Sequence, residues 1–418
     1  MSRVPAVRFK GFTDPWEQRK LGDCFDFLQN NTLSRADLNG ESGIARNVHY
    51  GDILIRYGDC LEDEAMSLPF VSNDEVAKKY RAAALHEGDI VFADTAEDEA
   101  AGKCVELLKL PVEPVIAGLH TIPARPRFSF GRGFLGHYLN SSAFHDQLLP
   151  LMQGIKVISV SKSALQDTTI RFPRTEEQAA IGRMLHCIDH LIALHQRKYD
   201  KLCTIKKSML DKMFPRPGEL VPEIRFEGFT DPWEQRKLGE MAEIVGGGTP
   251  NTGVESYWDG DIDWYSPAEL GAQIYADCSV RKITKAGYDS CSATLLPANT
   301  TILFTSRAGI GNTAILRRSA CTNQGFQSLV VNDDADVYFV YSMTNKIKKF
   351  AEQQASGSTF LEISGKGLAV GEFAFPSKDE QIRIGVFFQK FDSLITLHQR
   401  KLELLKNVKK SLLDKMFV

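Results

Sequence analysis

Residues 4–22 read Val-Pro-Ala-Val-Arg-Phe-Lys-Gly-Phe-Thr-Asp-Pro-Trp-Glu-Gln-Arg-Lys-Leu-Gly, and residues 221–239 repeat this stretch at 16 of 19 positions. A second pair of copies follows: residues 178–214 match residues 381–417 at 20 of 37 positions. The offsets are 217 and 203, so the segment between the repeats is 14 residues longer in the first half. An internal repeat decides the architecture before any other feature. The 418-residue chain is therefore expected to consist of two half-molecules of about 210 residues.

The two halves do not resemble each other evenly along the chain. Residues 23–174 and 240–377 share little sequence, although the repeats around them are close to identical. Neutral divergence after a duplication would spread the differences evenly. The contrast predicts two functions, namely a shared frame that meets the same partner twice and two readers of different targets. A simple structural duplication is the alternative.

The composition is that of a globular protein, and it excludes several classes. Hydrophobic residues make up 43% of the chain and charged residues 25%, and no window approaches the roughly 18 consecutive apolar residues of a membrane span. We expect a cytoplasmic protein with no membrane partner, because the N-terminus lacks the apolar region of a secretory signal. The net charge of −3 argues against a nonspecific nucleic-acid coat protein. The eight cysteines include no Cys-x-x-Cys pair, which favours reduced thiols over disulfides or metal ligands.

Residues 175–214 and 378–418 are predicted to form two long helices. Apolar side chains recur at steps of three and four residues over about five heptads, the spacing of a coiled coil. At 1.5 Å per residue, each helix is a rod of roughly 55 Å. Two such rods can pair antiparallel with one globular module at each end, and so act as a spacer. The predicted seam and docking residues are Ile188, Ile192, His195, Tyr199, Leu202, Phe391, Ile395, His398, Leu402 and Leu405.

The two histidines in this set are interpreted as seam residues rather than metal ligands, because no Cys, Asp or Glu shares their helix face at ligand spacing.

The variable segments are predicted to fold as mixed α/β modules. The predicted parts are the first module with its N-terminal repeat (1–174), the first helix (175–214), a linker with the second repeat start (215–235), the second module (236–377) and the second helix (378–418). Matching short motifs follow one another in the same order in both modules, so we expect one fold that presents a different surface in each module.

Several secondary-structure elements are expected inside the modules from apolar runs and turn residues. The strand candidates are Asp52–Arg56, Asp89–Ala93, Thr301–Phe304 and Ser328–Asn332, and the helix candidate is Val337–Gln354.

The sequence lacks the common cofactor-binding motifs. It has no G-x-x-x-x-G-K-[ST] loop for ATP, and it has no Pro-Pro pair, which excludes the Asn/Asp-Pro-Pro-Tyr/Phe loop with which amino-methyltransferases hold a flipped base. Residues 309–314 fit G-x-G-x-x-A, but the segment that follows is too short for a pyrophosphate-binding helix. We expect no catalytic residue, no metal and no cofactor on this chain. A self-contained methyltransferase or nuclease is an alternative, and it would require S-adenosylmethionine binding by the isolated chain.

Four features give the whole chain a specific resemblance. They are the paired Asp-Pro-Trp-Glu-x-x-Lys-Leu-Gly starts; the heptad helices opened by Glu177-Gln178 and Glu380-Gln381; Gly247-Gly-Thr-Pro250 with Tyr257–Ile262 and Trp264; and Ser306-Arg307 followed by Thr322–Gly325, Gly357–Phe360 and Glu362–Ser364. The chain resembles the specificity subunit of a type I restriction-modification system. The first variable segment departs from the pattern of the second, but it resembles one recurrent class of target recognition domain.

The resemblance implies a DNA-binding subunit with no chemistry of its own. Two target recognition domains each bind one half of a split, asymmetric site in double-stranded DNA, while the antiparallel helices fix the gap and dock two methyltransferase subunits. Those subunits bring S-adenosylmethionine and methylate adenine N6, and restriction subunits add ATP- and Mg-dependent translocation and cleavage. The alternative is a non-catalytic coiled-coil adaptor without DNA specificity of its own.

Candidate DNA contacts follow from the chemistry of readout, in which loop side chains read base edges and nearby Lys and Arg bind phosphates. The candidates are His120, Thr121, Arg125, Lys156 and Lys162 in the first module, and Ser306, Arg307, Asn323, Gln324, Thr359 and Lys366 in the second. For Asn323, shaping a turn is an equal alternative to contacting a base.

Overall fold

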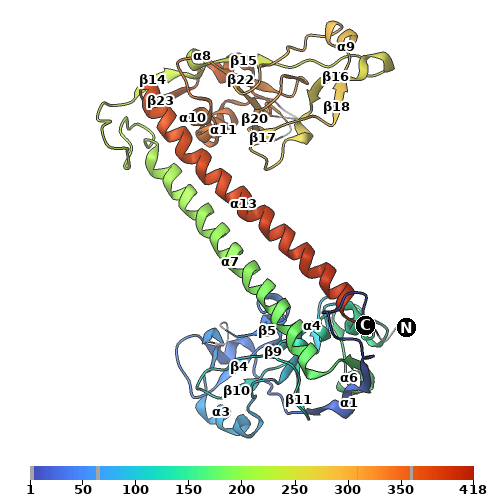
Figure 1. The fold of residues 1–418 in the computed structure, drawn as a ribbon. Helices are drawn as coiled ribbons and strands as arrows, with labels where there is room; N and C mark the ends of the chain where they lie inside the picture. The colour runs from blue at the N-terminus through green and yellow to red at the C-terminus, as the bar shows by residue number, and fades with distance from the viewer. Residues whose placement is uncertain (1–3, 63–65, 308, 358–360) are drawn as a thin grey trace. The chain divides into compact units, whose positions relative to one another are not determined.

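A computed structural model describes residues 4–62, 66–307, 309–357 and 361–418. The chain divides into two compact units: unit 1 is Met1–Gln196 with Arg400–Val418, and unit 2 is Arg197–Gln399. Two helices of 39 residues, α7 (Thr175–Met213) and α13 (Lys378–Met416), contribute residues to both units (Figure 1). Each unit therefore contains the start of one long helix and the end of the other.

Unit 1 is built on a five-stranded sheet in the order β2-β11-β7-β9-β5. Its strands are β2 (Phe25–Phe27), β11 (Thr121–Pro126), β7 (Ile90–Ala93), β9 (Cys104–Leu107) and β5 (Cys60–Leu61). A second sheet contains β10 (Val115–Ala117), β4 (Arg46–Val48), β6 (Phe70–Val71) and β3 (Leu38–Asn39). The short helices are α1 (Leu21–Cys24), α2 (Tyr50–Ile55), α3 (Asp74–Tyr80), α4 (Phe134–Leu139), α5 (Ser142–His145) and α6 (Lys162–Asp167).

Unit 2 repeats this topology with a five-stranded sheet in the order β15-β22-β19-β20-β17. Its strands are β15 (Ala242–Gly246), β22 (Gln327–Val331), β19 (Thr301–Phe304), β20 (Thr313–Leu316) and β17 (Tyr275–Ala276). A second sheet contains β18 (Arg281–Ile283), β16 (Trp258–Tyr265) and β21 (Ala320–Thr322). The short helices are α8 (Leu238–Met241), α9 (Lys285–Asp289), α10 (Val337–Ser342), α11 (Thr344–Gln354) and α12 (Gly365–Ala369).

The two five-stranded sheets have the same strand order and the same strand directions. In each, the first three neighbouring pairs are antiparallel and the last pair, β9·β5 or β20·β17, is parallel. Each unit adds a two-stranded antiparallel sheet, β1 (Glu17–Lys20) with β13 (Thr169–Phe172) in unit 1 and β14 (Glu234–Lys237) with β23 (Glu372–Phe375) in unit 2. The prediction of one mixed α/β fold in two copies is confirmed.

The repeated tryptophan packs against the phenylalanine that follows the other long helix. In unit 1, Trp16 contacts Phe417 edge-on, with the ring centroids 6.3 Å apart. In unit 2, Trp233 contacts Phe214 at 5.8 Å. All four side chains are buried in the cores that also hold the first turns of α7 and α13, respectively. The start of one helix thus lies beside the end of the other in each unit, which confirms the predicted antiparallel pairing.

A partly buried ion pair joins the two long helices in each unit. In unit 1, Lys409 Nζ on α13 lies 2.5 Å from Asp189 on α7. In unit 2, Lys206 Nζ on α7 lies 2.5 Å from Asp392 on α13. The two lysines are equivalent in the repeat, as are the two aspartates, so the same pair forms twice with the helices exchanged. A buried polar pair fixes helix register, which an apolar heptad pattern alone leaves open to a shift.

Gly182 and Gly385 are identical in the two long helices because loops approach the helix closely there. A Cβ on Gly182 would lie 2.2 Å from the carbonyl oxygen of Arg132, and one on Gly385 would lie 2.3 Å from Asp336 Oδ1. Glycine inside a helix costs about 0.5–1 kcal/mol relative to alanine. The close contact with the globular part of each unit therefore requires these glycines.

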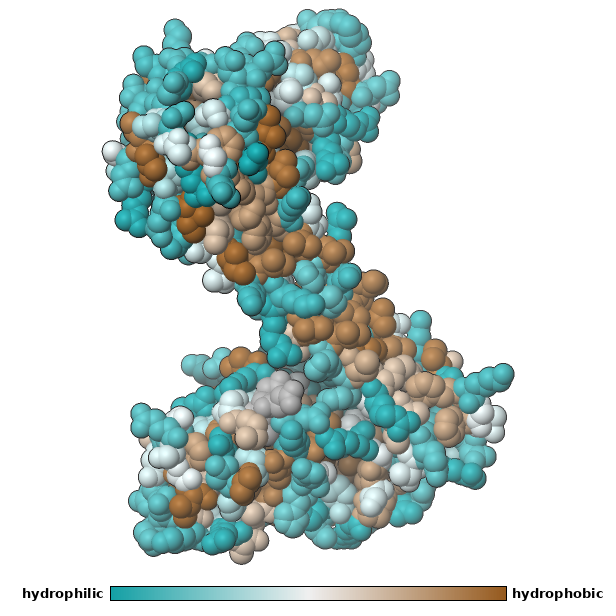
Figure 2. Space-filling view, turned by 60° about the vertical axis from the view of Figure 1, so that its left-hand side comes forward, coloured by the Kyte–Doolittle hydropathy of each residue, from teal (hydrophilic) through white to brown (hydrophobic). Residues whose placement is uncertain are grey.

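The ten predicted seam residues are all shielded from solvent to some degree. Leu402 is buried and the other nine are half-buried. Other apolar side chains on the same helices are exposed, and Figure 2 shows apolar surface along the helical part of the chain. The exposed set includes Leu191, Leu394, Leu397, Leu404 and Val408.

The segment Asp52–Arg56 was predicted to be a strand, and this prediction is wrong because most of it lies in helix α2. The His49 side chain accepts a hydrogen bond from Gly51 N and caps the helix. Ile53 in the helix and Tyr57 just beyond its C-cap are both buried. A short apolar run does not by itself distinguish a strand from a helix, and here the capping residue decides.

The other predicted elements lie close to their expected places. Strands β7, β19 and β22 confirm three of the strand candidates. The helix candidate Val337–Gln354 is interrupted at Met343, which separates α10 from α11. In the described part of the chain, no helix is both long enough and apolar enough to cross a bilayer.

Candidate nucleic-acid interface

Three segments of unit 1 meet where strand β7 ends and strand β11 begins. Asp94 N donates a hydrogen bond to His120 O at 3.1 Å, and Val160 N donates to Asp94 O at 2.8 Å. Thr95, in β8 (Thr95–Ala96), pairs with Ser159 in β12 (Ile158–Ser159). We call Asp94, Thr95, His120 and Ser159 the first junction.

The corresponding segments of unit 2 meet where β19 ends and β22 begins. Arg307 forms a backbone bridge with Glu362. Ser306 N donates to the carbonyl of Gly325 at 2.8 Å, and Asn323 lies in the turn that precedes β22. We call Ser306, Arg307, Asn323 and Glu362 the second junction.

The two junctions share a backbone frame and differ in their side chains. His120 and Asn323 are equivalent positions with the 203 offset, as are Ser159 and Glu362. The first junction presents hydroxyls, an imidazole and a carboxylate, whereas the second presents a guanidinium, an amide and a carboxylate. These groups are donors and acceptors of the kinds that match base edges. One frame with two sets of polar groups is the arrangement expected of two readers.

His120 is the most unusual residue of the first junction. Its φ of 54° lies in the left-handed region, which is uncommon for a residue other than glycine. Nδ1 lies 3.4 Å from both Thr95 Oγ1 and Asp94 Oδ1, and the ring lies edge-on to Tyr50 at 5.3 Å. The side chain is nevertheless 46% exposed. Backbone strain at an exposed and oriented polar group is typical of functional positions.

Arg307 is the partly exposed cation of the second junction. Its side chain is 36% exposed, and Nη1 lies 4.0 Å from Glu362 Oε2, beyond hydrogen-bond distance. The guanidinium therefore keeps donors that could pair bidentately with a base edge. Gln324, one residue after Asn323, is also exposed, and its Oε1 accepts a hydrogen bond from the Thr249 hydroxyl.

Two predicted contacts in unit 1 are occupied inside the unit. The buried Thr121 hydroxyl donates to Gly118 O at 2.6 Å. Arg125 donates two hydrogen bonds to Asp89, at 2.9 and 2.8 Å. Because both side chains are hydrogen-bonded inside unit 1, the structure does not support the prediction that they contact bases.

Two further predicted contacts lie in unit 2, where Ser306 is buried and Asn323 shapes its own turn. Ser306 is buried, and its carbonyl accepts a hydrogen bond from Ile363 N. Asn323 Oδ1 accepts from Gly325 N at 2.8 Å, which is the turn-shaping alternative.

The predicted lysines all lie on the surface. Lys156 and Lys162 of unit 1 and Lys366 of unit 2 are exposed, and Lys162 Nζ lies 5.1 Å from the centroid of the Phe27 ring. One further candidate of the second module, Thr359, lies outside the described residues.

Sequence reasoning did not single out Asp94, Thr95 or Tyr50 as contacts. Asp94 and Thr95 begin an acidic run that resembles a solvated loop. Tyr50 reaches the first junction only because α2 packs beside it. One signal in the sequence could have identified Thr95. It follows strand β7 just as Arg307, which was a candidate, follows strand β19.

Among the described residues, one group of acidic and imidazole side chains is close enough together to hold a metal ion: Asp59, His137 and Asp189. Lys409 Nζ lies 2.7 Å from Asp59 and 2.5 Å from Asp189, and so supplies the positive charge itself. Burial raises the pKa of Asp59, but the hydrogen bond with His137 and the charge of Lys409 outweigh burial and lower it well below its usual value. We interpret the group as a structural ion network.

Comparison with known families assigns this arrangement. The family described as "Type I restriction modification DNA specificity domain" matches residues 13–203 and 230–407, one match in each half of the chain. The chain belongs to this family. The resemblance based on the repeats and helices is thereby confirmed.

Two curated members of the specificity family are similar in sequence, both from Methanocaldococcus jannaschii. The type I restriction enzyme MjaIX specificity subunit is 34% identical over 190 residues, which span 44% of this chain and 44% of the relative. The putative type I restriction enzyme MjaX specificity subunit is 22% identical over 414 residues, which span 96% of this chain and 92% of the relative. The stronger similarity is thus confined to less than half of either protein.

A solved member of the specificity family has the same fold. The crystal structure of the type I restriction-modification S subunit from M. genitalium superposes with a TM-score of 0.65 at 14% sequence identity, covering 99% of both chains.

Proposed function

We propose that this chain is the DNA-reading specificity subunit of a type I restriction-modification complex. The observation that carries the proposal is the pair of junctions, in which one sheet topology presents two different sets of polar side chains. Each unit reads one half of a split, asymmetric site in double-stranded DNA. His120 with Asp94 reads bases in the first half-site, and Arg307 with Gln324 reads bases in the second.

Exposed lysines supply the part of binding that does not depend on sequence. Lys156, Lys162 and Lys366 bind phosphates and orient each unit on the duplex. Their small number fits the near-neutral net charge of −3. Binding through few phosphates loses little protein to nonspecific DNA.

The chain has no chemistry of its own in this proposal. Two methyltransferase subunits dock on it and bring S-adenosylmethionine for methylation of adenine N6. Restriction subunits join the complex and supply ATP- and Mg-dependent translocation and cleavage. The assembly works in the cytoplasm.

The proposal is tested by mapping methylated adenines in cells that express the chain with its partner subunits. A split motif with two unrelated half-sites is expected. Methylation without such a motif would favour the coiled-coil adaptor. S-adenosylmethionine binding by the isolated chain, measured by calorimetry, would instead favour the self-contained methyltransferase.

Arg307→Ala is expected to weaken binding of the assembled complex to its cognate site by about 1–3 kcal/mol, because a guanidinium bidentate to guanine contributes that much discrimination. The loss is expected at one base pair of the second half-site. A binding titration at fixed salt, with the cognate duplex and single-substitution duplexes, measures it. Arg216→Ala removes an equal charge from an exposed arginine of the same unit that pairs with Glu223, and serves as the control. Equal binding by the two variants would remove Arg307 from the interface.

Insertion of one heptad into both long helices, after Gln196 and after Gln399, is expected to lengthen the gap between the half-sites. Seven helical residues add about 10 Å, the length of about three base pairs at 3.4 Å per step. Insertion into both helices keeps Lys206 in register with Asp392. Mapping of methylated sites measures the gap, and an unchanged gap with intact half-sites contradicts a spacer role for the helices.

A further inference from the structure

A hairpin at residues 153–159 presents aliphatic side chains to solvent in unit 1. Ile155 is 99% exposed and Val157 is 56% exposed, and Lys156 between them is also exposed. Burial of apolar surface is favourable, so aliphatic side chains of this size are usually inside a protein. The tip of this hairpin is therefore an apolar surface that the fold of unit 1 leaves uncovered.

Backbone contacts hold the hairpin in a defined shape. Gln153 N donates a hydrogen bond to Ser159 O at 3.0 Å, and Ser159 N donates to Gln153 O at 2.8 Å. Gly154 has a φ of 116°, and a Cβ at this position would lie 1.9 Å from the carbonyl oxygen of Val157. The turn therefore requires glycine. The exposure of the tip follows from a closed turn rather than from an unstructured segment.

The base of the hairpin is fastened to the core of unit 1 and to the first junction. Met152 and Ile158 are partly buried and pack against the core. Ser159 in β12 pairs with Thr95 in β8, and both residues belong to the first junction. The apolar tip is thus connected directly to the polar groups that are proposed to read the first half-site.

Unit 2 repeats the frame of this hairpin with a different tip. Ser356 and Glu362 exchange the same two backbone hydrogen bonds, each at 3.1 Å, and Glu362 also bridges Arg307 in the second junction. In the sequence, Ser-Thr-Phe at 358–360 stands where the first copy has Ile-Lys-Val at 155–157. The fold therefore places a hairpin at each junction, and the sequence of the tip changes together with the junction side chains.

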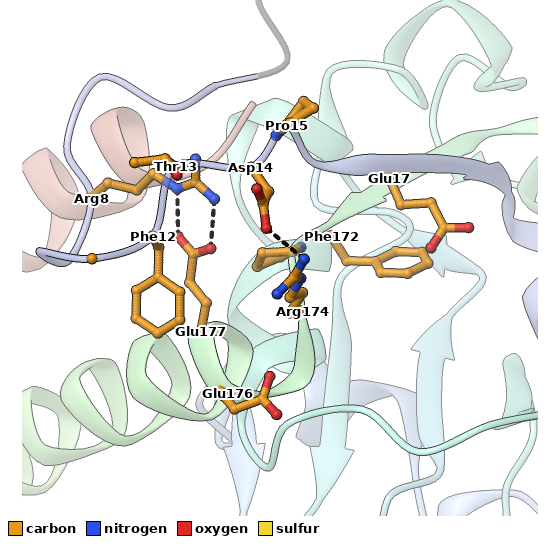
Figure 3. Close-up of a pocket in the computed structure, with 12 residues that line it drawn as sticks. Arg8, Phe12, Thr13, Asp14, Pro15, Glu17, Phe172, Arg174, Glu176 and Glu177 are labelled. Atoms are coloured by element: carbon orange, nitrogen blue, oxygen red, sulfur yellow. Dashed lines mark hydrogen bonds and ion pairs between the residues drawn. The ribbon is translucent and has the colours of Figure 1, made fainter.

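Charged side chains elsewhere on unit 1 find partners within the unit. In the pocket at the start of α7, Arg8 donates two hydrogen bonds to Glu177 at 2.7 Å, and Arg174 pairs with Asp14 at 2.8 Å (Figure 3). Polar groups that lack such a partner can bind water instead. An aliphatic side chain has no comparable partner in water, so the tip of the hairpin gains free energy only when apolar surface covers it.

The surroundings of the tip favour DNA as the covering surface. Lys156 lies within the tip and Lys162 lies on the following helix, α6; both are exposed and are proposed to bind phosphates. The faces of base pairs are apolar, and several DNA-binding proteins insert an aliphatic or aromatic side chain between neighbouring base pairs. An aliphatic side chain carries no donor or acceptor for base edges, so its contribution would come from shape and stacking.

We propose that Ile155 is a wedge that enters between two neighbouring base pairs at the first half-site and separates them. The inference rests on the proposed function, in which unit 1 reads that half-site. Separation of base pairs costs free energy that depends on the base step, and pyrimidine–purine steps such as TA and CA separate most easily. The wedge therefore adds a sequence preference at a step whose base edges no side chain has to read.

The test measures base stacking in the assembled complex on its cognate duplex, which mapping of methylated adenines identifies. 2-Aminopurine fluoresces more strongly when it is unstacked, and it replaces single bases in and beside the first half-site, away from the methylated adenine and its neighbours. Wild type is expected to raise the fluorescence at the wedged step. Ile155→Ser is expected to reduce the rise at least about fivefold, because serine cannot fill the opened step. Ile155→Leu is expected to keep the rise.

Val112→Ser is the matched control, because it removes a fully exposed aliphatic side chain from the same unit. Val112 lies between the end of β9 and the start of β10. The start of β9 pairs with the junction end of β7, and β10 runs toward His120, so Val112 lies at the opposite ends of these strands from the first junction. Val112→Ser is expected to keep the full rise in fluorescence.

Circular dichroism and native mass spectrometry check that each variant folds and assembles with the methyltransferase subunits, and Ile155→Ala replaces Ile155→Ser if the latter does not fold. An equal rise with wild type and Ile155→Ser would overturn the wedge, as would a wild-type complex that binds its site without a rise at any position. Loss of a methyltransferase subunit from Ile155→Ser would also overturn it and assign the tip to a protein contact. A wild-type complex that binds no split site would instead overturn the proposed function.

Discussion

Replacement of Lys409 by methionine is expected to destabilise unit 1 by about 3 kcal/mol. Methionine matches the length of the lysine stem but removes the ammonium that lies between Asp59 and Asp189. The two carboxylates would then face each other, and the side-chain partners of Asp59 that remain in the described part of the chain are His137 and Asn140. Removing one member of a buried ion network costs more than the network contributes, because the remaining charges stay desolvated.

The pKa values of the network set the pH range of this effect. Burial lowers the pKa of Lys409, but Asp59 and Asp189 outweigh burial and raise it, so the lysine stays charged. The pKa of Asp59 is lowered in the folded chain, so its contribution to stability is complete above the unfolded value of about 3.9 and is lost as the pH falls below it. The difference between wild type and variant is expected to shrink below about pH 4.

Hydrogen exchange measured by mass spectrometry separates the two units and checks this prediction. Amides of unit 1 are expected to lose protection in Lys409→Met, while those of unit 2 keep it. Lys410→Met changes the neighbouring exposed lysine and is expected to leave both units protected. Equal protection in Lys409→Met and Lys410→Met would mean that the network contributes nothing to folding.

Truncation of the phenylalanine that follows each long helix is expected to destabilise the unit in which the other helix starts. Phe417→Ala is expected to cost unit 1 about 3–5 kcal/mol, and Phe214→Ala is expected to cost unit 2 a similar amount. Phe417 fills the space between Trp16 and Tyr138, and Phe214 fills the space between Trp233 and Phe339. An alanine would leave a cavity under the repeated tryptophan.

The same hydrogen-exchange experiment shows which unit loses amide protection, and the position of the substitution in the sequence alone does not predict that unit. Phe214 lies in the first repeat, yet its loss is expected to deprotect unit 2 and spare unit 1. Val418→Ala, next to Phe417 but less buried, is the control for the chain end. Loss of protection in both units from either single substitution would show that the two cores unfold together.

The long helices could be predicted from the sequence to within one or two residues because their signals are local. Pro173 and Pro376 precede them, Pro215 follows the first, and the heptad pattern fills the interval. The repeats also predicted one fold with two surfaces. The segment Asp52–Arg56 failed because its few apolar residues fit a strand as well as a helix, and the cap from His49 outweighed that pattern.

The sequence predicted which segments form the candidate site, but it did not predict which side chains within them are already paired inside the unit. Matching landmarks placed His120 and Asn323 at equivalent positions in the sequence, but the backbone hydrogen bond that Asp94 N donates to His120 O has its counterpart in the one that Ser306 N donates to Gly325 O. Exposure separated the candidates, since the Thr121 hydroxyl is buried and the Arg125 guanidinium is paired with Asp89, whereas the His120 side chain is 46% exposed. Such partners come from strands distant in sequence, which no local pattern encodes. Tyr50 reaches His120 for the same reason.

The division of the chain has a consequence for its synthesis. Unit 2 is a continuous segment, Arg197–Gln399, whereas unit 1 needs the last residues of the chain, Arg400–Val418. Domains fold as their residues leave the ribosome. We expect the second unit to fold first, and Trp16 in the first unit to stay uncovered until residues Arg400–Val418 have been synthesised. A chain that stops before Arg400 would then carry one folded unit and one exposed core.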